Sequence, residues 1–324
     1  DVYKRQVLYR ETSGKVGALE DRCCHRGAPL THGMVVEEGI QCGYHGLIYA
    51  TDGKCVVVPG QKNIPKAARI KSYPTVERNQ IIWIWMGDPA LADESKIVPF
   101  PYHDDTEKWP YCKEHMPIKA NYLFMIDNLM DLTHLGYVHP RTIGGQPTAH
   151  IAAKKETRRT ANGAAFTRWM MGHDPPPTYK KGGNFIGKVD RWQEFEYVAP
   201  GVVLQWSGAL ACGSGALENR DQDGVHIRLL HCATPETKTT FHYFWSVANG
   251  YRQDEPEATQ ELYEDNFATF IEDKAIMEAQ QSRIDRDPAR PLVEIRADSA
   301  LALARIALGE MIDTERALAR ATME

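Results

Sequence analysis

Two short segments near the start of the chain each carry one cysteine and one histidine. Cys23 and His25 form a C-x-H pair, and after sixteen intervening residues Cys42 and His45 form a C-x2-H pair. Two thiolates and two imidazoles can hold one tetrahedral zinc ion or a 2Fe-2S cluster. A doubled ligand pair is far more specific than a single motif, so we favour metal binding over chance and the packing of buried cysteines.

The distribution of these four residues favours the cluster over zinc. Zinc fingers usually pair two cysteines in one motif and two histidines in another, whereas each segment here provides one of each. A cluster in which one iron takes both thiolates and the other takes both imidazoles suits this arrangement, because each segment then contributes one ligand to each iron. We therefore interpret Cys23, His25, Cys42 and His45 as cluster ligands.

A second constellation, D-x2-H-x4-H, lies in the apolar segment NLMDLTHLGYVHP at 128–140. Asp131 and His134 are three residues apart and would share one face of a helix. His139 is five residues beyond His134, which is the wrong spacing for a shared face, but Pro140 disfavours helical geometry at the residue before it. A break in the helix can therefore bring both histidines to one point.

Iron(II) that activates dioxygen typically takes two histidines and one carboxylate and keeps positions open for oxygen. Asp273 is our candidate for the carboxylate, because it shares a helical stripe with Phe270 and Met277 and so faces the core. A buried carboxylate without a partner is costly, and metal ligation would explain it. We expect its neighbour Glu272 to face solvent. A purely structural role stays open, since a histidine in an apolar helix is often a hydrogen-bonded core residue.

Composition and charge narrow the class of protein. The 324 residues suggest two domains, and 43% hydrophobic with 25% charged residues is ordinary for a globular protein. A net charge of -5 gives no footprint for nucleic acid or an anionic membrane, and the longest apolar block, at 81–86, is too short to span a bilayer. Seven scattered cysteines favour a reducing compartment, the cytoplasm. Because DVYKRQ leads directly into a strand pattern without a methionine, we expect the natural start to lie upstream.

The pattern of elements changes along the chain, which predicts an α+β protein. Residues 1–95 are expected to form a small all-β domain, with a turn at Asp52 and Gly53 and strands that include 70–73. A polar, proline-bearing segment at 87–110 marks the boundary. Residues 105–324 are expected to combine antiparallel strands with helices. The helices are predicted at 121–137, 256–284 and 299–321, the strands at 150–160, 165–171, 194–198, 202–206, 225–232 and 240–248, and a lid or plain surface loop at 172–184.

Several segments resemble one known family. CHRGAPL and CGYHG, at 24–30 and 42–46, resemble Rieske cluster-binding loops, except that Gly43 stands where proline is common. Together with NLMDLTHLGYVHP, TPETKTTFHYFW and FIEDKAIMEAQQ they resemble the oxygenase component of vanillate O-demethylase and dicamba-type Rieske monooxygenases over nearly the whole chain. The resemblance implies an N-terminal Rieske domain and a helix-grip-like catalytic domain.

The same resemblance implies roles for individual residues. His134, His139 and Asp273 match the ligands of a mononuclear iron(II), and Asn128 matches a residue close to that iron. Asp131 matches a carboxylate that bridges subunits of a homotrimer, joining His45 of one subunit to His134 of the next. Candidate pocket residues by position are Tyr122, Phe124, Trp206 and His231. A place in the core is favoured for the first three, and His231 is the candidate for binding a substrate carboxylate.

The reaction implied is O-demethylation of a methoxylated aromatic acid such as vanillate, with dioxygen as oxidant and formaldehyde as product. No G-x-G-x-x-G follows a strand, so we expect NADH to be oxidised by a separate reductase or ferredoxin system. Alternatives are a ring-hydroxylating dioxygenase and a demethylase of another aryl ether. An electron-transfer or zinc module without oxygen chemistry would leave Asp131, His134, His139 and Asp273 unexplained.

The loop cysteines predict the cluster's reduction potential. Rieske proteins of high potential carry an extra cysteine in each loop, joined as a disulfide, whereas Cys42 is the only cysteine of the second loop and leaves Cys24 without a loop partner. We expect a potential toward the lower end of the range of roughly -150 to +300 mV, suited to electrons from a reductase. Redox titration checks this, and a midpoint near the top of the range would contradict it.

Overall fold

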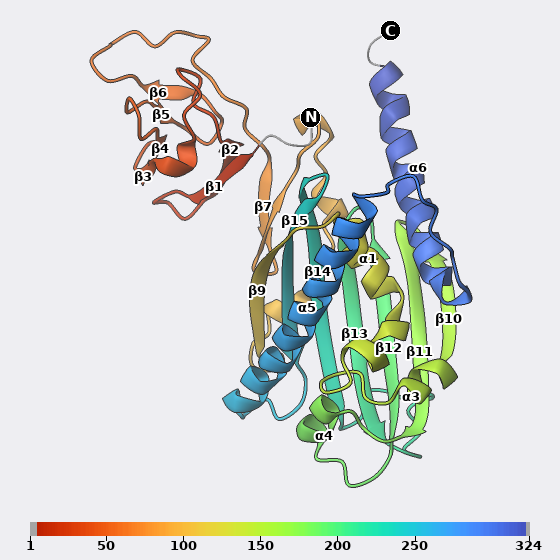
Figure 1. The fold of residues 1–324 in the computed structure, drawn as a ribbon. Coiled ribbons are helices and arrows are strands. Elements are labelled where there is room, and N and C mark those ends of the chain that lie inside the picture. The colour runs from red at the N-terminus through yellow and green to blue at the C-terminus, as the bar shows by residue number, and fades with distance from the viewer. Residues whose placement is uncertain (1–4, 322–324) are drawn as a thin grey trace. The chain divides into compact units, whose positions relative to one another are not determined.

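The computed structural model describes residues 5–321 and divides the chain into two compact units, Asp1–Pro99 and Phe100–Glu324 (Figure 1). The division falls within the segment at 87–110 where a boundary was expected. An all-β first unit and a second unit of antiparallel strands with helices confirm the predicted α+β class. No helix in the described part of the chain is long and apolar enough to cross a bilayer.

The first unit consists of short antiparallel strands around a small core. Its strands are β1 (Gln6–Arg10), β2 (Val16–Glu20), β3 (Met34–Val36), β4 (Gly39–Gln41), β5 (Ile48–Tyr49), β6 (Cys55–Val57), β7 (Thr75–Arg78) and β8 (Ile81–Ile84). β1 pairs with β2, β7 pairs with β8, and β3 to β6 form a four-stranded sheet. Its short 3-10 helices are Leu30–His32, Pro89–Leu91 and Glu94–Lys96.

Two turn and strand predictions in this unit have different outcomes. Gly53 adopts a φ of +80°, as the predicted turn requires, and a Cβ there would lie 2.1 Å from the carbonyl oxygen of Ile70. The strand expected at 70–73 is wrong, because this stretch makes only an isolated bridge between Ser72 and Leu19. One bridge is too short a ladder to form a strand, although Ile70 is buried in the core.

A seven-stranded antiparallel sheet forms the second unit, in the order β10-β11-β12-β13-β14-β15-β9. Its strands are β9 (Tyr111–Ile118), β10 (Lys154–Thr160), β11 (Gly163–His173), β12 (Val189–Val198), β13 (Val202–Ala211), β14 (Val225–Thr237) and β15 (Thr240–Asn249). Strand β9 was not predicted, because it is largely polar and contains Pro117. A proline is tolerated there since β9 is an edge strand.

The helices gather against one face of this sheet, as Figure 1 shows. They are α1 (Leu123–Met130), α2 (Leu135–Val138), α3 (Pro147–Ala152), α4 (Pro177–Gly183), α5 (Pro256–Ile284) and α6 (Ser299–Ala321). The 3-10 helices of this unit are Pro101–His103, Leu132–His134 and Arg296–Asp298. Helix α5 contacts β15 and β9, α6 contacts β10 and β11, and α1 contacts β12 and β14. The main apolar core lies between the helices and the sheet.

Three expectations for this unit need correction. The single helix predicted at 121–137 is broken at Asp131, where φ is -130° and ψ is 105°. The strand predicted at 150–160 begins only at Lys154, because α3 occupies the preceding residues. The segment at 172–184 is not a plain loop, since it contains α4, which contacts α5 and β14.

Candidate metal centres and active site

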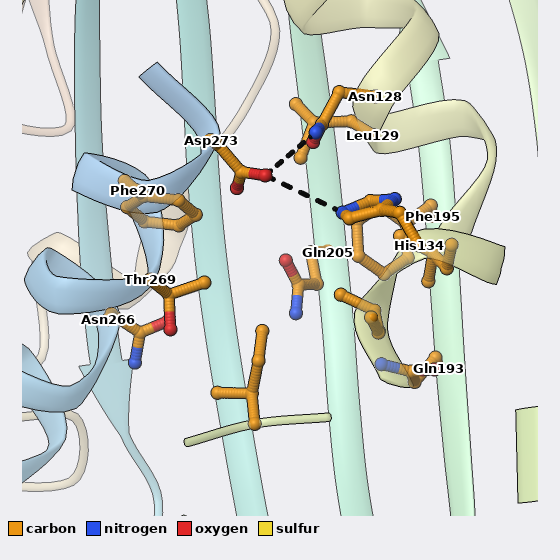
Figure 2. Close-up of a pocket in the computed structure, with 13 residues that line it drawn as sticks. Asn128, Leu129, His134, Gln193, Phe195, Gln205, Asn266, Thr269, Phe270 and Asp273 are labelled. Carbon is orange, nitrogen blue, oxygen red and sulfur yellow. Dashed lines mark hydrogen bonds and ion pairs between the residues drawn. The ribbon is translucent and has the colours of Figure 1, made fainter. Parts of the chain in front are cut away.

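Two histidines and one aspartate converge in the second unit, where the broken helix meets α5. The potential ligand atoms of His134, His139 and Asp273 all lie within 4.8 Å of one another. The Nε2 atoms of His139 and His134 lie 3.0 and 3.6 Å from the same oxygen, Oδ1 of Asp273. Figure 2 shows the Asp273 carboxylate pointing from α5 toward His134. The break at Asp131 brings the two imidazoles together despite their five-residue spacing.

Each member of this triad is held in place by a further hydrogen bond. The Nδ1–H of His134 donates to the backbone carbonyl of Asp131 at 2.8 Å, and Nδ1–H of His139 donates to Glu272 at 2.7 Å. Asn128 donates its amide to Oδ1 of Asp273 at 2.8 Å (Figure 2). Such partners orient ligand side chains, and here they turn both Nε2 atoms toward Asp273.

Two details differ from the expected site. Glu272 does not simply face solvent: its side chain is 45% exposed, yet its carboxylate bonds His139. The group of Asp131 that holds His134 is its carbonyl, whereas its carboxylate accepts hydrogen bonds from the backbone N–H and hydroxyl of Thr133. This carboxylate caps the short helix that carries His134.

Burial and charge act differently on the two imidazoles. Burial lowers the pKa of His134 despite the nearby Asp273. Burial also pushes the pKa of His139 down, but hydrogen bonds and charge from Asp273 and Glu272 outweigh it and raise that pKa. A bound cation would take the place of the proton between these groups. Two imidazoles and one buried carboxylate on one side of a point fit an iron(II) site with open positions.

A narrow pocket adjoins the triad. It is lined by residues of the broken helix, the loop between α2 and α3, α5 and two sheet strands, namely Asn128, Leu129, Leu132, His134, Leu135, Ile143, Gln193, Phe195, Gln205, Asn266, Thr269, Phe270 and Asp273. Its cavity volume is about 20 Å³, enough for one or two water molecules. An aromatic ligand therefore requires the lining side chains or helices to move apart.

In the first unit, the two Cys/His segments lie together. The rings of His25 and His45 lie 4.6 Å apart between centroids and are exposed, whereas Cys23 and Cys42 are buried. The Tyr49 hydroxyl lies 3.1 Å from Sγ of Cys23. Buried sulfur ligands and exposed imidazoles fit a cluster whose histidine-bound iron faces outward, and a hydrogen bond to sulfur is one of the features that set its potential.

Gly43 and Cys24 lie next to the candidate cluster ligands in these two segments. At Gly43 a Cβ would lie 2.4 Å from the carbonyl oxygen of His32, so this loop packs too closely for a side chain. Cys24 is a free, exposed thiol, consistent with its lack of a partner in the second loop.

Both units match protein families that occur together in one class of enzyme. A Rieske 2Fe-2S domain model matches residues 2–74, and a model of the vanillate O-demethylase oxygenase C-terminal domain matches residues 118–314. The chain belongs to the vanillate O-demethylase type of Rieske oxygenases. It is thus an oxidoreductase component related to monooxygenases.

Relatives of this Rieske oxygenase act on different aromatic compounds. The iron-sulfur subunit of a toluene-4-sulfonate monooxygenase system from Comamonas testosteroni is 40% identical, covering 95% of this chain and 89% of that protein. The vanillate O-demethylase oxygenase subunit of a Pseudomonas species is 34% identical over 97% and 96%. A crystal structure of dicamba monooxygenase bound to dicamba matches with a TM-score of 0.87 and 30% identity, over 97% and 91%.

Three of the four predicted pocket residues of this oxygenase lie elsewhere. Trp206 is on the opposite face of the sheet from Gln205, packed between the guanidinium groups of Arg220 and Arg228 at 3.9 and 3.8 Å. Trp206 therefore does not reach the pocket, because successive strand residues alternate between faces. Tyr122 and Phe124 pack against the main core and do not line the pocket.

His231 lies just behind the pocket wall. Its Nδ1 pairs with the Tyr243 hydroxyl at 2.6 Å and its Nε2 with Oε1 of Gln205 at 2.9 Å. Burial lowers the pKa of His231 to about 3, so the ring is neutral and both nitrogens are engaged. In this arrangement His231 reaches the pocket through Gln205, and a direct contact with a carboxylate stays a prediction.

Sequence reasoning missed Glu272 as a partner of His139, and Gln193 and Gln205 as pocket residues. Glu272 looked solvent-facing because only its carboxylate turns back toward the site. Gln205 interrupts an apolar run in VLQWS, and a polar side chain in the middle of such a run was the signal that could have identified it. Gln193 lies between charged residues in RWQEF, where the sequence carries no such signal.

Removing the Glu272 carboxylate should loosen the iron site. We expect Glu272→Ala to lower iron affinity about 10- to 100-fold, because His139 loses the partner that orients it. Glu272→Gln, which keeps an acceptor oxygen, should recover part of the affinity. Iron binding to the apoprotein, followed by titration against a chelator, measures this.

Glu261→Ala is the matched control, since Glu261 is an exposed glutamate on the same helix. Equal iron affinity in the Glu272→Ala and Glu261→Ala variants would remove Glu272 from the site.

Proposed function

We propose that this chain is the oxygenase component of a multicomponent system that O-demethylates a methoxylated aromatic acid, such as vanillate. One oxygen atom of O2 enters the methyl C–H bond and the other leaves as water, using two electrons and two protons. The resulting hemiacetal breaks down to a phenol and formaldehyde. The observation that carries this proposal is the triad of His134, His139 and Asp273 beside an aromatic-lined pocket.

We assign the mononuclear iron(II) to this triad, through Nε2 of each histidine and the Asp273 carboxylate. The bound iron would supply the oxygen activation that protein side chains lack. A solved structure of the related dicamba monooxygenase contains non-heme iron and dicamba, and it matches this chain with a TM-score of 0.76. Asn128 fixes the orientation of Asp273, which supports its assignment as a residue close to the metal.

The chain's own residues would bind and orient the substrate. Leu129, Phe195 and Phe270 provide apolar surface for a ring and keep water away from it. Gln193 and Gln205 supply the polar contacts that such a pocket needs for orientation. Because the pocket is too small for an aromatic ring, its lining side chains or helices would move apart when the substrate binds.

Electrons would reach the site through the 2Fe-2S cluster that we assign to Cys23, His25, Cys42 and His45. NADH would be oxidised by a partner reductase or ferredoxin system, and the relatives named as system subunits and oxygenase components support this. We further propose a homotrimer in which His45 of one subunit meets Asp131 of the next. Exposure of the His45 ring leaves it accessible for such a contact.

A second candidate substrate is an aryl methyl group on an aromatic sulfonate. It is favoured by the 40% identity to the toluene-4-sulfonate monooxygenase subunit. The same oxygen insertion on a ring-attached methyl gives a stable benzyl alcohol, so no formaldehyde would be released.

Asp131→Asn should remove the negative charge of the proposed bridge while keeping the helix cap that this residue forms. Asparagine caps helices as well as aspartate does, and the carbonyl that holds His134 is unchanged, so both metal sites should stay loaded. We expect turnover to fall about 10- to 100-fold, as for other outer-shell partners of metal ligands. Metal analysis and turnover with a surrogate reductase measure the two effects, and near-normal turnover would exclude the bridge.

The reaction itself is tested by a substrate screen. The purified oxygenase with a surrogate reductase is given methoxybenzoates, including vanillate, and toluene-4-sulfonate, with formaldehyde and organic products quantified. Formaldehyde equal to the phenol formed supports O-demethylation, and a benzyl alcohol without formaldehyde identifies the sulfonate reaction. A cis-diol product would contradict both and indicate a ring-hydroxylating dioxygenase.

A further inference from the structure

Two arginines are buried in the second unit with no negative partner. Arg168 on β11 is 3% exposed and Arg191 on β12 is 2% exposed. Their hydrogen bonds go to neutral acceptors, Nδ1 of His150 and the carbonyl of Ile143, and the Nε of each has no partner. Across residues 5–321 neither guanidinium takes part in an ion pair. A buried charge without a counter-charge is costly. Binding a negatively charged ligand would offset that cost.

Both arginines face the substrate pocket side of the sheet. Arg168 pairs directly with Gln193 across the strands, and Met170 pairs with Arg191, so the two arginines are diagonal neighbours on one face. Gln193 lines the pocket. Ile143, whose carbonyl accepts from Arg191 at 3.2 Å, lines it as well. Arg191 therefore contacts the pocket wall through Ile143, and Arg168 lies beside Gln193 on the same face of the sheet.

Gln193 itself is an unsatisfied polar group at that wall. The residue is 2% exposed, and its Oε1 has no hydrogen-bond partner among the residues that the structure describes. Figure 2 shows Gln193 across the pocket from α5, apart from the carboxylate of Asp273. Buried amides are nearly always hydrogen-bonded, and a rotated amide can present its NH2 group to an acceptor in the pocket.

The groups around the arginines do not neutralise them. Burial and the two arginines lower the pKa of His150 to about 4, so it stays neutral and donates from Nε2 to the carbonyl of Gly144. The charge of Asp131 acts on Arg168 from a distance, but its carboxylate bonds Thr133 and forms no ion pair with Arg168 within residues 5–321. Arg191 also stacks on the Tyr179 ring at 4.4 Å, which holds it in place without a negative charge.

We propose that Arg168, Arg191 and Gln193 form an oxyanion-binding wall that recognises the carboxylate or sulfonate group of the aromatic substrate. The inference rests on the proposed function for the aromatic part of the ligand. Guanidinium groups suit both oxyanions, because their N–H donors match paired oxygens. Because the aromatic ring needs the pocket to widen, the anion meets Gln193 and the two guanidinium groups in the widened pocket.

Binding without turnover tests this wall independently of the reaction. Isothermal titration of the metal-loaded oxidised protein, with no reductase present, compares vanillate with its uncharged methyl ester. A second arm compares toluene-4-sulfonate with the neutral 4-methylphenyl methyl sulfone. In Arg168→Met, Arg191→Met and Gln193→Leu we expect the Kd of the anion to rise about 10- to 100-fold, as for loss of a charge-assisted hydrogen bond. The Kd of the neutral partner should stay within about twofold.

Stability separates recognition from a structural role. Replacing an uncompensated buried charge by an apolar side chain of similar size should leave the melting temperature unchanged or raise it. Arg158→Met, at an exposed arginine of β10, is the matched control and should change neither measurement. Arg168→Lys and Arg191→Lys keep the charge and should retain part of the anion affinity even if a Met variant fails to fold.

The outcomes are distinct. A selective loss for vanillate alone, or for the sulfonate alone, supports the wall and identifies which oxyanion it takes. Equal effects on the charged and neutral partners, or no effect on either, overturn it. If anion binding depends on the wall but no product forms with any substrate, the wall stands and the proposed reaction fails.

Discussion

One buried carboxylate organises the catalytic unit. Oδ1 of Asp273 receives the Asn128 amide at 2.8 Å and lies 3.0 and 3.6 Å from the Nε2 atoms of His139 and His134. Asp273 is only 3% exposed, and an uncompensated charge at such a site costs about 3–5 kcal/mol. The broken helix and α5 are therefore held in one arrangement by the need to satisfy a single oxygen.

The break at Asp131 follows from the same need. An unbroken helix would turn His139 away from His134, because each residue rotates the helix by about 100°. By capping a new short helix with its side chain and accepting from His134 with its carbonyl, Asp131 resets the direction of the chain. It does both with hydrogen bonds to residues within three positions along the chain.

In both units, buried and exposed side chains have different roles at the candidate site. In the first, Cys23 and Cys42 are buried and His25 and His45 are exposed, so a cluster held by them would exchange electrons on its histidine side. In the second, apolar side chains and neutral polar groups such as His231 surround the pocket, while positive charge is concentrated behind Gln193. A low-dielectric interior strengthens each of these electrostatic effects.

Local chemistry in the sequence determined which residues could bind metal and where the long helices run. The Cys/His pairs, the D-x2-H-x4-H spacing, the core-facing stripe of Asp273 and the helices α5 and α6 could all be predicted, because each depends on neighbours within a few residues. Tertiary structure alone decided that Glu272 turns back to His139, that Trp206 faces away from the pocket, and that Arg168 and Arg191 lie behind Gln193. Those facts depend on strand register and on contacts between residues more than a hundred positions apart, which no short-range pattern encodes.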